Sequence, residues 1–209
     1  MKAPTFEADL PMHYQKVFYL NAKRPKTAIW LTLISLIPLI PAIILAVRPP
    51  NAVIRVGSVW LLPLIPLAWM AAYVLLLVAH ELLHGLAYRL LTGQKLTFGL
   101  SWSCAYCGVP GIYVYRRTAL IALILPFAVI TPVLLLCLWF FRSHPILFDS
   151  TLLLLGGHTG GCVGDLYLFV LFLFRYRKRE ALIQDTGPEQ TIYLPAETPA
   201  SEPPQETVS

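Results

Sequence analysis

The chain has 209 residues, of which 57% are hydrophobic and 13% are charged. Soluble domains carry about 25% charged residues, so this composition excludes a disordered protein and a typical soluble enzyme, and four cysteines are too few for a disulfide framework. The net charge of +5 does not indicate a nucleic-acid partner, because the cations flank apolar runs as orientation signals do. We therefore expect one domain of membrane-spanning helices that contacts lipid.

Four long apolar stretches carry few or no charged residues. A helix needs about 20 residues to cross the hydrocarbon core, and three of the stretches fit one crossing each. The remaining stretch, residues 56–88, is too long for one crossing and too short for two. Pro63 and Pro66 break it near its start, and Gly93 is a common stop for the helix that follows. The pattern predicts spanning helices over residues 27–47, about 67–91, 118–141 and 150–174.

Orientation follows from the cations outside these stretches. Thirteen of the sixteen Lys and Arg lie before the first stretch, in the 89–117 region or after residue 174. Because loops rich in Lys and Arg stay in the cytoplasm, we expect a multi-pass protein of the cell membrane with both termini cytoplasmic. Residues 94–117 contain an alternating apolar run and turn residues, which predict a short hairpin on the cytoplasmic side.

The predicted fold class is all-α: a membrane protein of four transmembrane helices, with a short cytoplasmic β-hairpin between the second and the third. Residues 1–26 form a cytoplasmic N-terminal segment, and residues 27–180 form the helical transmembrane domain. Residues 181–209 are rich in proline and acidic residues without an apolar period, so they are expected to be a disordered cytoplasmic tail. Five glycines between Gly156 and Gly164 predict close packing of the last helix.

The strongest chemical signal is His80-Glu81-Leu82-Leu83-His84, an H-E-x-x-H motif within a helical pattern. Residues four apart on a helix differ by about 40° and rise about 6 Å, so both imidazoles can bind one Zn²⁺. Glu81 lies one step around the helix, where it can take a proton from an attacking water. An ionisable residue at membrane depth is itself a functional indication. The motif therefore predicts metal ligands at His80 and His84 and a general base at Glu81.

A catalytic zinc needs a third protein ligand, and the spans offer two candidates, Asp165 and His158. On a continuous helix these two residues share a face about 10 Å apart along the axis, so only one reaches a given depth. Asp165 lies nearer the cytoplasmic end, as the motif does, and its charge offsets that of the metal in an apolar site. Asp165 is therefore the predicted ligand, and His158 is expected to be a core histidine or a residue of the cavity above the site.

These residues resemble a known family. Small integral-membrane proteins of the zincin peptidase family carry H-E-x-x-H-G on one helix and a G-D pair on a later span, and here His80–Gly85 and Gly164-Asp165 are similar to those motifs. Pro126 in the third span is similar to the family's proline there. The resemblance covers roughly residues 70–175. It implies a distant relation to site-2 proteases, in which two histidines and a distant aspartate hold the metal.

The predicted function is a zinc-dependent, membrane-embedded peptidase that hydrolyses peptide bonds in or near the membrane, with a membrane protein or peptide as substrate. The predicted hairpin could hold an unwound substrate by strand addition. Two alternatives remain open: a thiol–quinone oxidoreductase that uses Cys104 and Cys107, and a metal-binding scaffold without catalysis. The cation count places Cys104 and Cys107 in a reducing compartment, which opposes the first, and Glu81 would have no role in the second.

Overall fold

The computed structural model describes residues 4–46, 64–101, 105–178 and 180–196. Its helices are α1 (Pro25–Ser35), α2 (Leu39–Ala46), α3 (Leu64–Thr92), α4 (Arg116–Phe141), α5 (Pro145–Gly161), α6 (Val163–Val170) and the π-helical segment η2 (Leu171–Arg175). Its strands are β1 (Phe6–Glu7), β2 (Tyr14–Asn21), β3 (Thr97–Leu100), β4 (Ala105–Gly108), β5 (Tyr113–Tyr115), β6 (Leu182–Asp185) and β7 (Glu189–Pro195).

Local sequence explains where several helices begin and end. Pro25 and Pro145 occupy the first turns of α1 and α5, where a proline costs no hydrogen bond and presets the backbone. Helix α3 ends at Thr92, followed by Gly93 with φ of 69°, a left-handed stop that glycine adopts without strain. This helix agrees with the one predicted over residues 67–91.

Among the described residues, three helical segments are long and apolar enough to cross a membrane: Pro25–Ala46, Leu64–Thr92 and Arg116–Phe141. The fourth segment predicted as one continuous helix, residues 150–174, is instead two helices, α5 and α6 with η2, that meet at an angle of 44°. The break falls at Cys162, directly after Gly160 and Gly161, because glycine opposes helix formation. Large apolar side chains such as Trp30, Leu67 and Phe140 lie more than 60% exposed along the helices.

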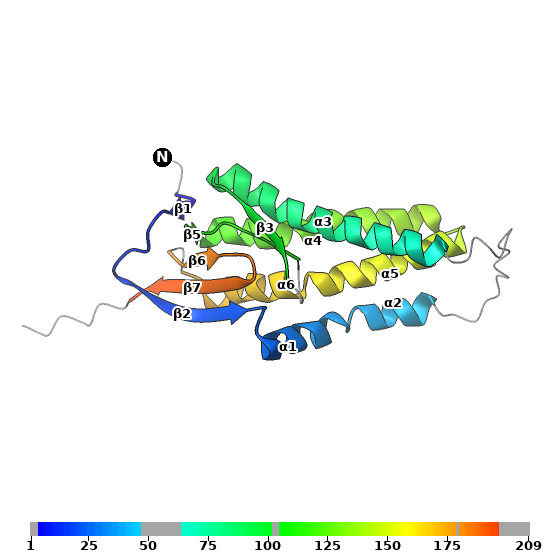
Figure 1. Cartoon of the computed structure of the whole chain (residues 1–209), viewed down its shortest axis with the longest axis horizontal. Helices are drawn as coiled ribbons and strands as arrows, with labels where there is room; N and C mark the ends of the chain where they lie inside the picture. The colour runs from blue at the N-terminus through cyan, green and yellow to red at the C-terminus, as the bar shows by residue number, and fades with distance from the viewer. Residues whose placement is uncertain (1–3, 47–63, 102–104, 179, 197–209) are drawn as a thin grey trace, which may run out of the picture.

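The prediction of an all-α fold is wrong, because five strands form an antiparallel sheet in the order β1-β5-β6-β7-β2. Figure 1 shows this sheet at one end of the long helices, with β2 leading directly into α1. Residues of three distant segments meet there: the N-terminal region, the end of the 94–117 loop and the region after residue 181. Apolar residues of the sheet, among them Val114, Ile183 and Ile192, pack with the ends of α4 and α6 in one buried core.

The hairpin predicted between the second and third spans is also differently built. Strand β3 pairs with β4 in a separate two-stranded sheet, from Thr97 opposite Gly108 to Leu100 opposite Ala105. Strand β5, from the same loop, joins the larger sheet instead, so the strands of the structure are not confined to one hairpin.

The expectation of a disordered tail from residue 181 is wrong up to Pro195, where β6 and β7 form a hairpin. The hairpin turns at Gly187, whose φ of 98° suits glycine. Cross-strand burial of Leu182, Ile183 and Ile192 stabilises it. The rest of the predicted tail, residues 197–209, lies outside the described residues.

Glycines bring α1 and α2 against α5. A Cβ atom added to Gly160 would overlap the backbone oxygen of Ser35 at the end of α1, whereas one added to Gly161 would meet nothing within 4 Å. Gly156 makes a similar close approach to Ala42 of α2. Small residues thus let these helices pack closely. The sequence predicts close packing against the helix of the H-E-x-x-H motif instead, and there Gly157 alone of these glycines meets α3, at the Tyr73 side chain.

We expect Gly160→Ala to destabilise the protein by about 1–3 kcal/mol, because the added methyl group overpacks against a backbone atom that cannot move alone. Thermal unfolding of the detergent-solubilised protein measures the effect. Gly161→Ala is the matched control, since it adds the same methyl group to the same helix in open space. Equal unfolding temperatures for the two variants would contradict the packing described for α1 and α5.

Candidate metal centre

His80 and His84 lie in the second half of α3, one helical turn apart, and both side chains are buried. Their ring centroids are 4.8 Å apart, and the two Nε2 atoms approach to 3.1 Å. Both imidazoles therefore lie on one side of α3, as the four-residue spacing on a helix predicts.

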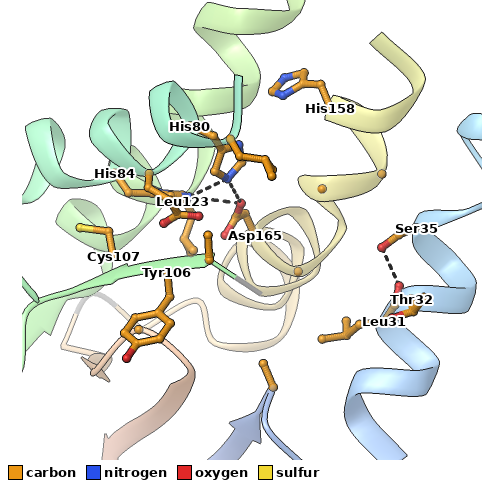
Figure 2. A pocket seen from close by; sticks show the side chains of 18 of the residues that line it. Leu31, Thr32, Ser35, His80, His84, Tyr106, Cys107, Leu123, His158 and Asp165 are labelled. Carbon is orange, nitrogen blue, oxygen red and sulfur yellow. Dashed lines mark hydrogen bonds and ion pairs between the residues drawn. The ribbon is translucent and has the colours of Figure 1, made fainter. Parts of the chain in front are cut away.

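Asp165 reaches the same point from α6. Its Oδ2 atom lies 3.1 Å from Nε2 of His80 and 3.3 Å from Nε2 of His84, and Figure 2 shows the three side chains converging. Asp165 stands in the first turn of α6, directly after the break at Cys162, where the helix dipole favours a carboxylate. The bend between α5 and α6 thus places Asp165 in the first turn of a new helix.

The three atoms match the donor set of a zinc site. Ligand atoms held about 2.0–2.1 Å from a tetrahedral Zn²⁺ lie about 3.3–3.4 Å from one another, and the three distances here are 3.1, 3.1 and 3.3 Å. Two imidazoles and one carboxylate are also ligand types that zinc accepts in catalytic sites. These residues therefore fit the metal in both spacing and chemistry.

A carbonyl of α4 orients His84. The Nδ1 atom of His84 lies 2.9 Å from the oxygen of Ala122, and because a carbonyl only accepts, Nδ1 carries the proton and Nε2 presents its lone pair to the centre. In a regular helix the Ala122 oxygen would accept from the N–H of residue 126. That residue is Pro126, inside α4, and proline has no N–H. Pro126 therefore leaves this carbonyl available to the histidine.

Glu81 lines the same cavity of about 450 Å³ as the three converging side chains. The cavity is bounded by Leu31 and Thr32 of α1 on one side and by Tyr106 of β4 on another. Figure 2 shows α1 facing His80 and Asp165 across this space, with Tyr106 beneath them. The carboxylate of Glu81 thus shares an accessible chamber with the centre, as a proton acceptor for a reacting water must.

A second pair of polar side chains continues down α3. The hydroxyl of Tyr88, one turn beyond His84, donates to Oδ2 of Asp185 in β6 over 2.6 Å, and the Asp185 Oδ1 atom accepts from the N–H of Gly187. Burial raises the pKa of Asp185 above its usual range, and these two hydrogen bonds oppose the rise. Sequence reasoning missed Asp185, because it lies in the segment interpreted as disordered. Tyr88, however, follows the motif at helical spacing.

Of the two cysteines of the C-x-x-C motif, the structure describes Cys107, which is buried in β4. Burial, with the nearby carboxylates of Glu81 and Asp185, raises the pKa of Cys107 to about 12, so its thiol stays protonated at neutral pH. A reactive cysteine needs a lowered pKa instead. Cys104, its predicted partner, lies outside the described residues.

His158 lies on α5. Unlike Asp165, it does not contact the Nε2 atoms of His80 and His84. It is buried next to Cys162, and its ring centroid is 5.9 Å from that of His80. Because the chain bends by 44° at Cys162, His158 and Asp165 lie on two different helices and not on the one continuous helix that the sequence predicts. The two candidates instead approach His80 from different sides.

The comparison with protein families is decisive here. A model of a family described as putative zincin peptidase matches residues 73–180, which include the motif on α3, Pro126 and Asp165. The chain belongs to this family. A metallopeptidase-like function follows from this membership, and the family implies zinc. Comparisons with curated proteins and with solved structures find no match.

We expect Pro126→Ala to lower metal affinity by about 10–100-fold, the usual effect of losing a partner that orients a ligand. The alanine N–H would compete with His84 for the Ala122 oxygen. Equilibrium dialysis against Zn²⁺ buffers measures the change. Pro132→Ala is the matched control, since it restores an N–H in the same helix away from His84, and an equal loss in both variants would contradict the role of Pro126.

Proposed function

We propose that the chain is a zinc-dependent peptidase whose site lies within the membrane and hydrolyses peptide bonds in or near it. The observation that carries the proposal is the convergence of His80, His84 and Asp165 within hydrogen-bond distance of one another, from two helices. These three residues are the proposed ligands. An isolated aspartate amid apolar helices would be costly, and a cation between it and the histidines removes that cost.

Zinc, when bound, supplies a Lewis acid that polarises the substrate carbonyl and makes water more acidic. Glu81 is the proposed general base: it accepts the proton of the attacking water and returns it to the departing amide nitrogen. Its neighbouring position to His80 and its place in the cavity wall support this role. The His84 Nδ1–H, held by the Ala122 oxygen, keeps one ligand ring fixed while the reaction proceeds.

Membrane embedding is supported by three apolar segments of spanning length and by the large apolar side chains exposed along them. The proposed orientation has both termini and the 94–117 loop in the cytoplasm. Strands from these same three regions form one sheet, which supports the proposal that all of them lie on one side. Their common excess of Lys and Arg makes the cytoplasm the proposed side.

Lipid is the proposed surrounding, and a membrane protein or a peptide is the proposed substrate. The cavity has apolar walls on α1 and polar groups at the centre, which suits an unwound apolar segment with an exposed peptide bond. Such a segment must leave its helical state, because a helix hides its carbonyls in internal hydrogen bonds.

Glu81→Gln should keep the metal and lower hydrolysis by about 10²–10⁴-fold, because the amide cannot accept the proton that the carboxylate accepts. Metal content and cleavage of a model membrane substrate are measured on the same purified sample. Full activity in this variant would exclude the general-base role, and loss of metal would place Glu81 among the ligands.

Asp165→Ala should lose both the copurifying metal and activity, whereas His158→Ala should keep the metal. The reason is geometric: Asp165 faces both Nε2 atoms and His158 does not. Metal analysis of the purified variants decides between them. The reverse pattern would show that the third ligand lies on α5.

Reporter fusions at residue 1 and at residue 209 should both read as cytoplasmic. The common sheet supports the same side for the two ends of the described chain, and the cations favour the cytoplasm as that side. A fusion at residue 143, between α4 and α5, serves as the opposite control and should read as external. Opposite results for the two termini would contradict the sheet as well as the orientation.

A further inference from the structure

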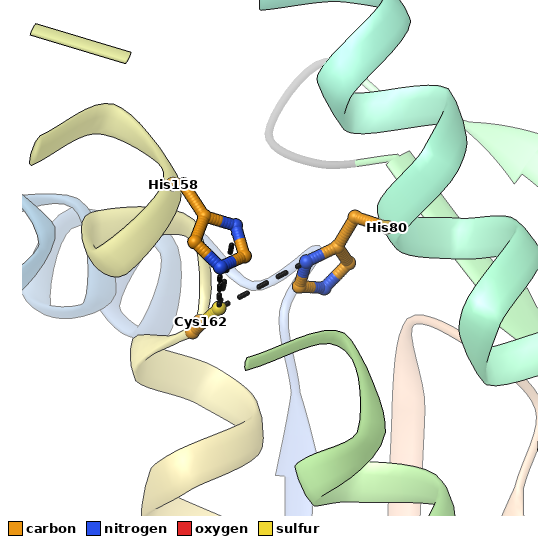
Figure 3. A group of neighbouring side chains, drawn as sticks. All are labelled: His80, His158 and Cys162. Carbon is orange, nitrogen blue, oxygen red and sulfur yellow. Dashed lines mark hydrogen bonds between the residues drawn. The ribbon is translucent and has the colours of Figure 1, made fainter. Parts of the chain in front are cut away.

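His80 has a second group of neighbours on its other nitrogen. Its Nδ1 atom lies 3.9 Å from the sulfur of Cys162, and the ring nitrogens of His158 lie 3.8 and 3.7 Å from that same sulfur. Figure 3 shows His80 of α3 facing His158 and Cys162 across the space between the helices. The candidate ligand atoms of these residues all lie within 4.8 Å of one another.

His158 is poorly satisfied by the protein. Its side chain is 4% exposed and lies against the Phe127 ring, at a centroid distance of 6.4 Å. Within the described part of the chain, the polar partner of both its ring nitrogens is the Cys162 sulfur, and a thiol is a weak hydrogen-bonding group. A buried imidazole in an apolar bundle needs a better partner, and it lies in the wall of the same cavity as the first centre.

The spacing and the donor types suit a metal ion. A tetrahedral Zn²⁺ with about 2.3 Å to sulfur and about 2.0–2.1 Å to nitrogen places those atoms about 3.6 Å apart, close to the 3.7–3.9 Å found here. Two imidazoles and a thiolate form a softer donor set than two imidazoles and a carboxylate. This group therefore favours thiophilic cations more strongly than the first centre does.

We propose that His80, His158 and Cys162 form a second metal site, for thiophilic cations such as Zn²⁺ in excess, whose occupation takes His80 from the first site. A neutral imidazole offers one lone pair at a time. When Nδ1 binds the second metal, the ring proton moves to Nε2, where it donates to Asp165 over 3.1 Å, and the Cys162 thiol proton leaves to water. The first centre then lacks one ligand.

This site would make excess metal an inhibitor, a regulatory role that rests on the proposed function. The test of metal binding at the site is independent of that function. The metal probe is Co²⁺. A cobalt–thiolate bond produces a charge-transfer absorption, whereas bonds from cobalt to imidazole or carboxylate ligands do not produce it. The protein is full-length His84→Ala, solubilised in detergent, in which the first centre is disabled and Asp165 remains. We expect added Co²⁺ to bind at one ion per chain with the thiolate absorption.

Two variants in the His84→Ala background should abolish that absorption: Cys162→Ser, and independently His158→Gln. Cys107→Ser is the matched control and should keep it, since Cys107 lines the same cavity from β4. No absorption in His84→Ala, or absorption unchanged by Cys162→Ser, would overturn the second site. A loss in Cys107→Ser would overturn it too and assign the thiolate to β4.

An activity measurement tests the regulatory role separately. Excess Zn²⁺ should inhibit hydrolysis by the otherwise unaltered protein, and the ratio of activities with and without excess should rise toward one in Cys162→Ser. The same activity ratio in Cys162→Ser as in the unaltered protein would overturn the regulatory role. The existence of the second site would still be decided by the cobalt measurement. A wild-type protein inactive at every zinc concentration would contradict the proposed peptidase function and leave the cobalt result unaffected.

Discussion

The arrangement of the helices depends on placing one carboxylate against two imidazoles inside an apolar bundle. A carboxylate such as that of Asp165 is costly among apolar helices without a positive partner, and its Oδ2 atom lies 3.1 and 3.3 Å from the two histidine Nε2 atoms. To reach them, the chain breaks at Cys162 and starts a new helix at Val163, two residues before Asp165. The glycines of α5, which let α1 and α2 approach closely, also weaken the helix where it bends. One stretch of small residues thus serves both the packing and the centre.

A second constraint comes from backbone hydrogen bonds that an apolar helix bundle leaves unsatisfied. A proline within α4 removes one backbone donor, and the freed carbonyl would be costly in an apolar environment. His84 supplies the missing donor, so the irregularity of one helix orients a side chain of another. At the end of the bundle, Arg116 donates from Nε over 2.8 Å to the backbone oxygen of Phe172, which lies within the π-helical segment η2. Broken helices are tolerated here because neighbouring side chains satisfy the exposed backbone groups.

Sequence reasoning reached the centre because its signals are local and periodic. The H-E-x-x-H spacing predicts that two imidazoles share a side of α3, and they do. A comparison of depths predicts that Asp165 rather than His158 faces them, and the structure brings Asp165 there, although its role as a ligand remains a prediction. The premise of a continuous helix was wrong. The bend at Cys162 lets His158 approach the opposite nitrogen of His80, which a straight helix would not show.

The sheet escaped prediction because its strands are short and far apart in the chain. Strands of two and three residues, β1 and β5, carry no readable alternation, and their pairing depends on contacts across more than 100 residues. The β6–β7 hairpin did carry a signal, a Gly187 turn followed by the β-prone residues 191–194. The acidic and proline-rich composition of the surrounding tail concealed it.

The position of the sheet gives it a role beyond stability. Strand β6 presents Asp185 to Tyr88, which follows His80 and His84 along α3 at intervals of four residues. Asp185, Gly187 and Gln190 also line the cavity that contains the centre, so the hairpin forms part of its wall. Because a buried Tyr–Asp pair is costly to separate, movement of the sheet is coupled to α3 itself. One buried hydrogen bond thus links the hairpin in the cavity wall to the helix that carries the two histidines and Glu81.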